Sequence, residues 1–441
     1  MPGTALRDFD YEPGRYGAGR VAPFADVPRP TTFPEHLEFW ASVFVIFTFS
    51  QGWAAPLTGW AVDPTKLTLL KVGFLPAYLV VLVLGALRPI GTVATLVRTP
   101  LIYMLVALAG ASMLWSIDGG ATSRRTIALI FTTLAGTVLA SRWPPDRLAE
   151  IIGAQFLASM TLSFMFAVLP PHHGIMTELF PGAWRGVWTE KNGLGAMMAL
   201  GSVACLAAAF MVRERRLIWL MGFFGCLVLV LLSQSKTSLL ALVLGSAAIF
   251  GVWLLQRGPV WAVATTWLAV AGGLALAAVV FLAPELIFDG LNKDATLTGR
   301  TNIWVAAIRQ ANLHDPTWGF GYGVLWDHKQ PFYPGAWIAH DAGFAAGHAH
   351  NGWLEVWLGL GYVGLALWTL SYLRTSVRVI GSAYRSMAGY LALPFFLIFS
   401  VMSITEVSIL DYQDVAWVIY VMIAAALVQG SHPFRPGAAA I

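Results

Sequence analysis

Long apolar segments separated by short polar ones run along almost the whole chain. Twelve of these segments are long enough, or nearly so, to cross a bilayer as helices at about 1.5 Å per residue. They cover roughly residues 38–55, 66–87, 100–117, 124–141, 148–169, 193–212, 217–233, 237–256, 259–283, 352–373, 388–407 and 413–430. This pattern predicts an all-α polytopic membrane protein with about 12 transmembrane helices.

One long polar interval interrupts the pattern between the ninth and tenth segments. Residues 284–351 contain five of the nine histidines and several charged residues. Loops of this length are usually either functional or disordered. This one is rich in Trp, Tyr and Phe, which disfavours disorder. We therefore expect a large ordered extracytoplasmic loop between helices 9 and 10 that carries the chemistry.

These patterns divide the chain into five parts. We expect a disordered cytoplasmic tail at residues 1–36, which are rich in Gly, Pro and Arg and lack a signal-peptide pattern. Transmembrane helices 1–9 follow at 37–283, and the catalytic loop occupies 284–351. Transmembrane helices 10–12 span 352–430, and residues 431–441 form a second cytoplasmic tail.

Composition supports the membrane assignment and narrows the function. Only 11% of the residues are charged and the mean hydropathy is +0.68, whereas a soluble protein carries about a quarter charged residues. Cys205 and Cys226 both lie inside apolar segments, so neither a disulfide framework nor a cysteine metal site is indicated. The pI of 9.1 comes from basic residues scattered at helix ends, which is typical of membrane topology rather than of nucleic-acid binding.

The distribution of basic residues predicts the orientation. Loops with several arginines, such as 213–216 and 374–385, are strong cytoplasmic markers. With the N-terminus inside, 16 of the 27 Lys and Arg residues are cytoplasmic and all 16 are arginine, leaving 11 in the remaining segments. Both termini are therefore expected in the cytoplasm and the 284–351 loop outside.

Basic residues on the outer side run against this bias, so each requires a local reason. Arg124 and Lys66 are equally well explained as side chains that reach the membrane surface from a helix end. The wider group suggests an anionic ligand held at the outer face of the membrane. It gathers at helix ends and comprises Arg124, Arg125, Arg185, Lys191, Lys236 and Arg300.

Helix-capping and basic residues alternate just before the sixth apolar segment, where residues 184–195 read WRGVWTEKNGLG. Thr189 or Asn192 is suited to cap the following helix. Arg185 and Lys191 are not, because cations near a helix N-terminus oppose its dipole. A phosphate bound by these two side chains and by free backbone N–H groups would account for them.

Two further stretches place a single cation near the start of a helix. Residues 233–238 read SQSKTS, a turn in which Lys236 is the residue that suggests ligand contact. Residues 298–304 read TGRTNIW and open a stretch of helical periodicity, and the forked guanidinium of Arg300 suits a phosphate or carboxylate. We expect Arg185, Lys236 and Arg300 to converge on one anionic ligand.

The polar interval ends in residues 348–355, HAHNGWLE, where it passes into an apolar helix. A general base is the favoured role for one of the two histidines, His348 or His350, since an imidazole can take a hydroxyl proton near neutral pH. We expect His348 to point in a different direction from His350. Glu355 lies one helical turn after Asn351 and is placed to orient a partner on that face. The H-x-H pair is also a metal-ligand pattern, but no further ligand spacing completes a site, so neither a metal nor a cofactor is expected.

Four short elements, in this order, resemble the O-antigen ligase / Wzy-type polymerase superfamily. They lie at residues 185–192, at 233–237 (S-x-S-R/K-T), at 299–304 (G-R-x-x-I-W) and at 350–355 (H-N-x-x-L-E). The resemblance covers most of the membrane part from about Arg124 onward. The sequences of these elements are most similar to those of exopolysaccharide polymerases of the succinoglycan type. Lys236 departs from the arginine of many members, which keeps the charge but loses bidentate pairing.

The resemblance implies a membrane glycosyltransferase in the bacterial cytoplasmic (inner) membrane, with its active site facing the periplasm. It would polymerise undecaprenyl diphosphate-linked oligosaccharide repeat units into exopolysaccharide, with the lipid-linked donor, the growing glycan chain and the lipid bilayer as partners and no nucleic acid. The residues implied are, as catalytic groups, His350, Arg300 and Glu355; for the diphosphate, Arg185, Lys191, Lys236 and Arg300; and in support, Asn192, His348 and Asn351.

The aromatic residues of the loop have two interpretations, stacking on sugar faces or packing within the loop. Packing is favoured for any single one of them. They are Trp318, Tyr322, Trp326, Phe332, Tyr333 and Trp337.

Two other functions fit part of the pattern. A ligase of the same fold would transfer a finished glycan to lipid A core or to protein, and only the acceptor would differ. A polysaccharide transporter would need ionisable residues near the bilayer midplane, or broken helices paired between two halves of the chain. The apolar segments contain few such residues and no internal repeat is visible, so transport is the less favoured alternative.

Overall fold

The computed structural model describes residues 33–60, 70, 72–178, 180–282, 300–326, 333–343 and 347–428. Helices make up the regular structure of this part, and its single β contact is an isolated bridge between Ile175 and Trp184. The predicted all-α class is therefore confirmed. The helices are α1 (Phe33–Phe49), α2 (Ala54–Thr58), α4 (Leu75–Leu87), α5 (Pro89–Arg98), α6 (Pro100–Ala111), η2 (Ser112–Leu114), α7 (Gly119–Arg142), α8 (Pro145–Val168), α9 (Lys191–Met211), η3 (Arg213–Arg215), α10 (Arg216–Leu232), α11 (Lys236–Leu255), α12 (Pro259–Leu282), α14 (Arg300–Leu313), α15 (Pro334–Ala342), α16 (Gly352–Arg385), α17 (Gly389–Thr405) and α18 (Val415–Ala426).

Each of the twelve predicted apolar segments overlaps one of these helices. By length and composition, six described helices can cross a membrane, and a seventh crossing is possible if α4 and α5, which meet at an angle of 101°, form one broken span. The six are α8, α9, η3 with α10, α11, most of α12, and α16. The polytopic architecture is thus confirmed, while the full set of twelve crossings stays a prediction.

Several predicted features lie partly or wholly outside the described residues. The terminal tails lie outside, except that α1 already begins at Phe33. Lys66 and Lys71 lie outside as well. Of the 284–351 loop, the structure describes α14, the segment 314–326, α15 and residues 347–351.

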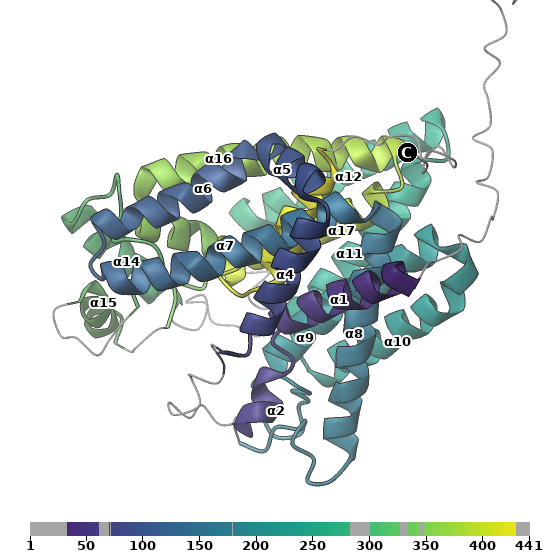
Figure 1. The fold of residues 1–441 in the computed structure, drawn as a ribbon, viewed down its shortest axis with the longest axis horizontal. Coiled ribbons are helices and arrows are strands. Elements are labelled where there is room, and N and C mark those ends of the chain that lie inside the picture. Colours follow the sequence, from purple (N-terminus) through teal and green to yellow (C-terminus); the bar gives the residue numbers. More distant parts are fainter. Residues whose placement is uncertain are drawn as a thin grey trace, which may run out of the picture.

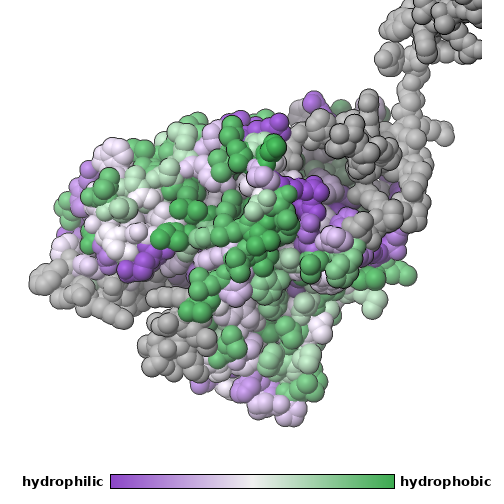
Figure 2. All heavy atoms as spheres, viewed as in Figure 1, coloured by the Kyte–Doolittle hydropathy of each residue, from purple (hydrophilic) through white to green (hydrophobic). Residues whose placement is uncertain are grey.

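Large apolar side chains cover much of the surface, as Figure 2 shows for one face. On α4 and α5 they include Leu79, Leu82, Ile90 and Val97, all more than 45% exposed. A soluble protein rarely exposes so large an apolar surface. Contact with lipid accounts for it, in keeping with the apolar helices.

Antiparallel packing of α11 against α17 fixes the two ends of the molecule. The side chain of Gln256, just after α11, donates to Ala383 O and Ser386 O, just before α17, at 3.1 and 3.0 Å. Gly245 in the middle of α11 packs against Ile398 in the middle of α17. The start of α11 therefore lies beside the end of α17. This register carries Lys236, a residue from the predicted cation group, to the same end as Glu406.

Arginines from two predicted cytoplasmic loops meet at a shared acidic residue. Glu150 of α8 accepts from Arg147 at 2.6 Å and from Arg215 at 3.2 Å. Arg142 forms an ion pair with Glu38 of α1. Loops far apart in sequence are thus brought to one side, as the predicted topology requires.

The segment after α14 is clamped against α16 and the turn between α6 and α7. Phe320 N and Gly321 N donate to Leu358 O and Gly359 O of α16 at 2.9 and 3.0 Å, and Ile117 N donates to Phe320 O at 3.2 Å. Figure 1 shows α6 running between α16 and α7, and it packs against both. This part of the 284–351 loop therefore rests on α16 and on the turn between α6 and α7.

Candidate functional site

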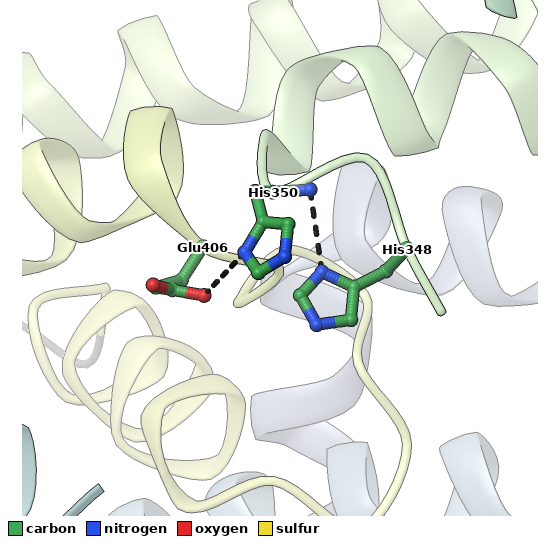
Figure 3. Close-up of side chains that lie close together, drawn as sticks. All are labelled: His348, His350 and Glu406. Atoms are coloured by element: carbon green, nitrogen blue, oxygen red, sulfur yellow. Dashed lines mark hydrogen bonds and ion pairs between the residues drawn. The ribbon is translucent and has the colours of Figure 1, made fainter. Parts of the chain in front are cut away.

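Two histidines and a glutamate meet where the polar loop enters α16. His350 Nδ1 lies 3.2 Å from Glu406 Oε2, and the centroids of the His348 and His350 rings are 3.9 Å apart. Figure 3 shows the His350 ring between Glu406 on one side and His348 on the other. Glu406 follows directly after α17, so the cluster joins the loop to a helix end more than fifty residues later in the chain.

The loop is held at Ala349, the residue between the two histidines. Ala349 is fully buried, its N–H donates to Glu355 Oε1 at 2.6 Å, and its carbonyl accepts from the Trp304 indole at 2.7 Å. The Asn351 side chain caps α16 by accepting from the backbone N–H groups of residues 353 and 354, both at 3.1 Å. These contacts fix the backbone on both sides of His350 and leave its imidazole partly exposed.

The expected direction of His348 is wrong. We expected it to point away from His350, but the rings are neighbours, and the His350 N–H donates to His348 Nδ1 at 3.2 Å. The buried Ala349 between them turns inward, and the left-handed φ of His350, +50°, turns the chain so that the two rings lie side by side. Burial, followed by the proximity of His350, lowers the pKa of His348, which favours its neutral form.

Arg300 joins the cluster through the same carboxylate. Its Nη2 lies 3.3 Å from Glu406 Oε1, so the two oxygens of Glu406 face a guanidinium and an imidazole. Burial alone would raise the pKa of Glu406, but the hydrogen bond from His350 and the charges of His350 and Arg300 outweigh burial and lower that pKa. Glu406 therefore stays ionised beside the His350 ring.

Glu406 is the member of the cluster that sequence reasoning missed. It stood at the end of a predicted apolar segment, 388–407, with no motif around it. The available signal was a carboxylate at the end of an apolar helix, because ionisable residues in such segments are usually functional.

Glu355, expected beside a reacting group, acts on the backbone in this structure. Its carboxyl group accepts from the Ala349 N–H, six residues before it. This contact fixes the loop that carries the histidine pair. That contact makes Glu355 a positioning residue in the geometry observed.

The cluster also completes a set of three possible metal donors that spacing alone did not reveal. Donor atoms of His348, His350 and Glu406 all lie within 4.8 Å of one another. A divalent cation would compete there with the fixed charge of Arg300 on Glu406, and with the His350 N–H on His348 Nδ1. The donor set is therefore geometrically possible but electrostatically poor for a metal.

Lys236 lies at the exposed start of α11, after a turn whose serines are buried. The hydroxyl groups of Ser235 and Ser238 share a hydrogen bond of 2.8 Å. Gln234, which lies between the end of α10 and Ser235, has a φ of +54°. The predicted arrangement, a tight turn presenting one cation, is thus present. The α11–α17 register places this cation at the Glu406 end of the molecule.

Arg185 lies at the same side but in a local setting of its own. Trp184 N donates to Leu232 O, which puts this element beside the Lys236 turn. The Arg185 Nε donates to His173 O at 2.8 Å, and its guanidinium lies 5.8 Å from the centroid of the Trp60 ring. Part of the role of Arg185 is therefore to pack against Trp60 and the backbone of His173.

Lys191 and Asn192 are the first two residues of α9. Neither Thr189 nor Asn192, the two predicted caps, caps this helix. The residue at the N-cap is Glu190, and no side chain caps the helix there. Lys191 Nζ instead lies 3.9 Å from the centroid of the Phe180 ring. The structure therefore supplies no capping role for this element that would compete with ligand binding.

Comparison with known proteins identifies similar sequences. Residues 221–369 match the Wzy_C family model, described as O-antigen ligase. Over these residues the chain is similar to the O-antigen ligase family. The exopolysaccharide production protein ExoQ of Rhizobium meliloti (strain 1021) is 32% identical over 200 residues, which are 42% of this chain and 44% of ExoQ. The match thus spans less than half of that relative.

The O-antigen ligase region contains three of the four elements that carried the resemblance. Lys236, Arg300, His348, His350 and Glu355 lie inside it. The element at 185–192 precedes it and Glu406 follows it, so the cluster draws one of its members from beyond the matched residues.

Proposed function

We propose that the chain is a membrane glycosyltransferase that polymerises undecaprenyl diphosphate-linked oligosaccharide repeat units into exopolysaccharide at the outer face of the cytoplasmic membrane. The observation that carries this proposal is the linked set of His350, Glu406 and Arg300 at the end of an O-antigen ligase region. A base and a cation lie together there, as glycosyl transfer from a diphosphate requires.

In this mechanism His350 takes the proton of the acceptor hydroxyl. Its Nδ1–H donates to the ionised Glu406, which leaves Nε2 as the atom that accepts the proton. The acceptor oxygen forms a bond to the anomeric carbon of the donor sugar as the bond from that carbon to the diphosphate oxygen breaks. Glu406 stabilises the resulting imidazolium, and undecaprenyl diphosphate leaves with the bonding electron pair.

Cations stabilise the charge that develops on the leaving diphosphate. Arg300 is already at the cluster, and Lys236 is brought to the same end by the pairing of α11 with α17. Arg185 and Lys191, on the neighbouring element, extend the positive surface. Fixed cations supply this electrostatic stabilisation without a metal, so we expect transfer to continue in the presence of EDTA.

A ligase that transfers a finished glycan to another acceptor is the second candidate, favoured by the description of the matched family. The two are distinguished by the glycan that accumulates when the gene is deleted. A polymerase deletion leaves single repeat units, whereas a ligase deletion leaves full-length glycan without its acceptor. Unchanged glycans in the deletion strain would overturn both proposals.

A further inference from the structure

A second site candidate lies away from the histidine cluster, in the clamped segment after α14. An open cleft of about 400 Å³ is lined by Trp115, His314, Asp315, Trp318 and Gly319. Its size is within the usual range for ligand pockets, about 300–1,000 Å³. Trp318 is 43% exposed, so one part of its ring is open to a ligand.

The cleft is built on rigid backbone. Trp115 donates its indole N–H to Trp318 O at 3.1 Å, and the two rings meet edge to face with centroids 5.3 Å apart. His314 stacks on Phe320 at 4.5 Å, and one Asp315 oxygen accepts from Thr317 N at 2.9 Å. The rings and polar groups are therefore held in place before any ligand arrives, which lowers the entropic cost of binding.

Such a surface matches one face of a pyranose sugar. The C–H groups on that face are apolar and slightly positive, while the face of an indole ring is negative. The sugar hydroxyls would find a carboxylate and an imidazole at the rim, both able to form hydrogen bonds. A diphosphate would instead be repelled by Asp315, and the described residues that line the cleft include no lysine or arginine.

We propose that this cleft binds a sugar residue of the glycan substrate, with Trp318 as the stacking platform. The inference rests on the proposed function for the choice of ligand. The cleft lies beside Gly361 of α16, which packs against Thr317. Gly361 is nine residues beyond Gly352, the first residue of α16 after the histidine cluster, which corresponds to about 14 Å along the helix axis. The cleft is thus a separate subsite within reach of one oligosaccharide, suited to hold the chain while its end reacts.

The competing explanation for an exposed tryptophan here is an anchor at the membrane surface, where Trp is enriched. The test uses the full-length protein in nanodiscs and, as probe, fragments of one to three repeat units released from the polysaccharide of the wild-type cells. The fragments carry a dye at the reducing end, and binding is followed by fluorescence anisotropy. Trp337→Ala is the matched control, because Trp337 is similarly exposed, at 48%, but lies on α15 outside the cleft.

We expect Trp318→Ala to weaken fragment binding about tenfold, as loss of an aromatic anchor does. Trp318→Phe should retain most of the affinity, and Trp337→Ala all of it. The polysaccharide made by Trp318→Ala cells should be shorter, with an unchanged number of chains per inserted protein. His350→Ala should bind fragments normally, so failure of the proposed base is read separately from failure of this subsite.

Three results would overturn the subsite. One is that the wild-type protein binds no fragment, and another is that Trp318→Ala binds them as tightly as the wild-type protein. The third is that Trp318→Ala lowers only the amount of membrane-inserted protein, with binding and chain length per molecule unchanged, which would identify Trp318 as a membrane anchor.

Discussion

At the scale of single residues, His350 combines chemical and conformational signs of function. Its φ of +50° lies in the left-handed region, which costs a residue with a side chain about 1–2 kcal/mol. The contacts of Ala349 with Glu355 and Trp304 hold the backbone in this conformation. Strain of this kind persists where surrounding structure enforces it, and it is concentrated at active sites. Here it aims the ring at Glu406.

The role of His350 as base gives the first prediction. His350→Ala should slow glycosyl transfer about 10²–10⁴-fold, the range for a lost general base, while donor binding stays intact. His348→Ala should cause a smaller but clear loss, because its ring contacts that of His350. The measurement is polymer formed per membrane-inserted protein. His340→Ala is the control, since its side chain is 89% exposed on α15. Full activity in His350→Ala would exclude the mechanism.

Glu406 gives a prediction with a pH signature. Its lowered pKa keeps the carboxylate charged, so Glu406→Gln removes a charge that stabilises the protonated imidazole. Transfer should slow about tenfold for each 1.4 kcal/mol of lost stabilisation. The acidic limb of the pH–rate profile should also move to lower pH. A purely structural Glu406 would lower the amount of folded protein and leave the shape of that profile unchanged.

The sign of the stability effect follows from the same shift. A carboxylate with a lowered pKa in the folded state stabilises that state above the pKa of the unfolded chain. This contribution is lost as the pH falls through the folded value. The melting temperature of Glu406→Gln should therefore be lower than that of the wild-type protein at neutral pH. The difference between the two melting temperatures should shrink on acidification.

At the scale of elements, α16 contains a break that positions both the loop and the cleft. Gly361 has φ +64° and ψ −165°, outside helical values. The freed N–H groups of the next turn bind the preceding segment, with Tyr362 N donating to Pro316 O at 2.9 Å and Val363 N to Thr317 O at 3.3 Å. The break thus lets the carbonyls of Pro316 and Thr317 bond to the N–H groups of α16, which fastens the segment after α14 to this helix.

Gly361→Ala should destabilise the protein. An added methyl group would collide with the carbonyl of Thr317, and the left-handed backbone adds about 1–2 kcal/mol. The melting temperature in detergent should fall, and the local stability should decrease most in the segment 315–323. Gly381→Ala in the same helix is the control, because its added carbon meets nothing within 4 Å and should be neutral or stabilising by up to about 1 kcal/mol. Equal melting temperatures for the two variants would contradict this account of the break.

Local patterns predicted these elements better than they predicted the contacts between them. Apolar periodicity located a helix at every expected segment, and Asn351 caps α16 within the motif singled out. The partner of His350 could not be found in this way, because Glu406 reaches it only through the packing of α17 against α11 and α16. The break at Gly361 likewise depends on carbonyls supplied by Pro316 and Thr317, more than forty residues earlier.

At the scale of the whole molecule, the pairing of α11 with α17 separates two ends. One carries Lys236, Glu406 and the histidine cluster, and the other carries Gln256 and Ser386. The arginine-rich stretch 374–385 was expected to be a loop, but in the structure it forms the last turns of α16 and runs into the second end. The polar loop runs into the first end. The helix register thus puts the arginine-rich stretch and the polar loop at opposite ends of the same pair.

The last prediction is that the histidine end faces outward. Because the helix pair defines both ends, one labelled residue at each is enough to determine the orientation. Asn312→Cys, exposed on α14, should react with a membrane-impermeant maleimide in spheroplasts. Met387→Cys, at a position 40% exposed beside Ser386, should react only after permeabilisation. The native Cys205 and Cys226 are buried and add little background. Labelling of Met387→Cys in sealed spheroplasts would reverse the topology, and it would place the histidine cluster on the side where arginine-rich loops are expected.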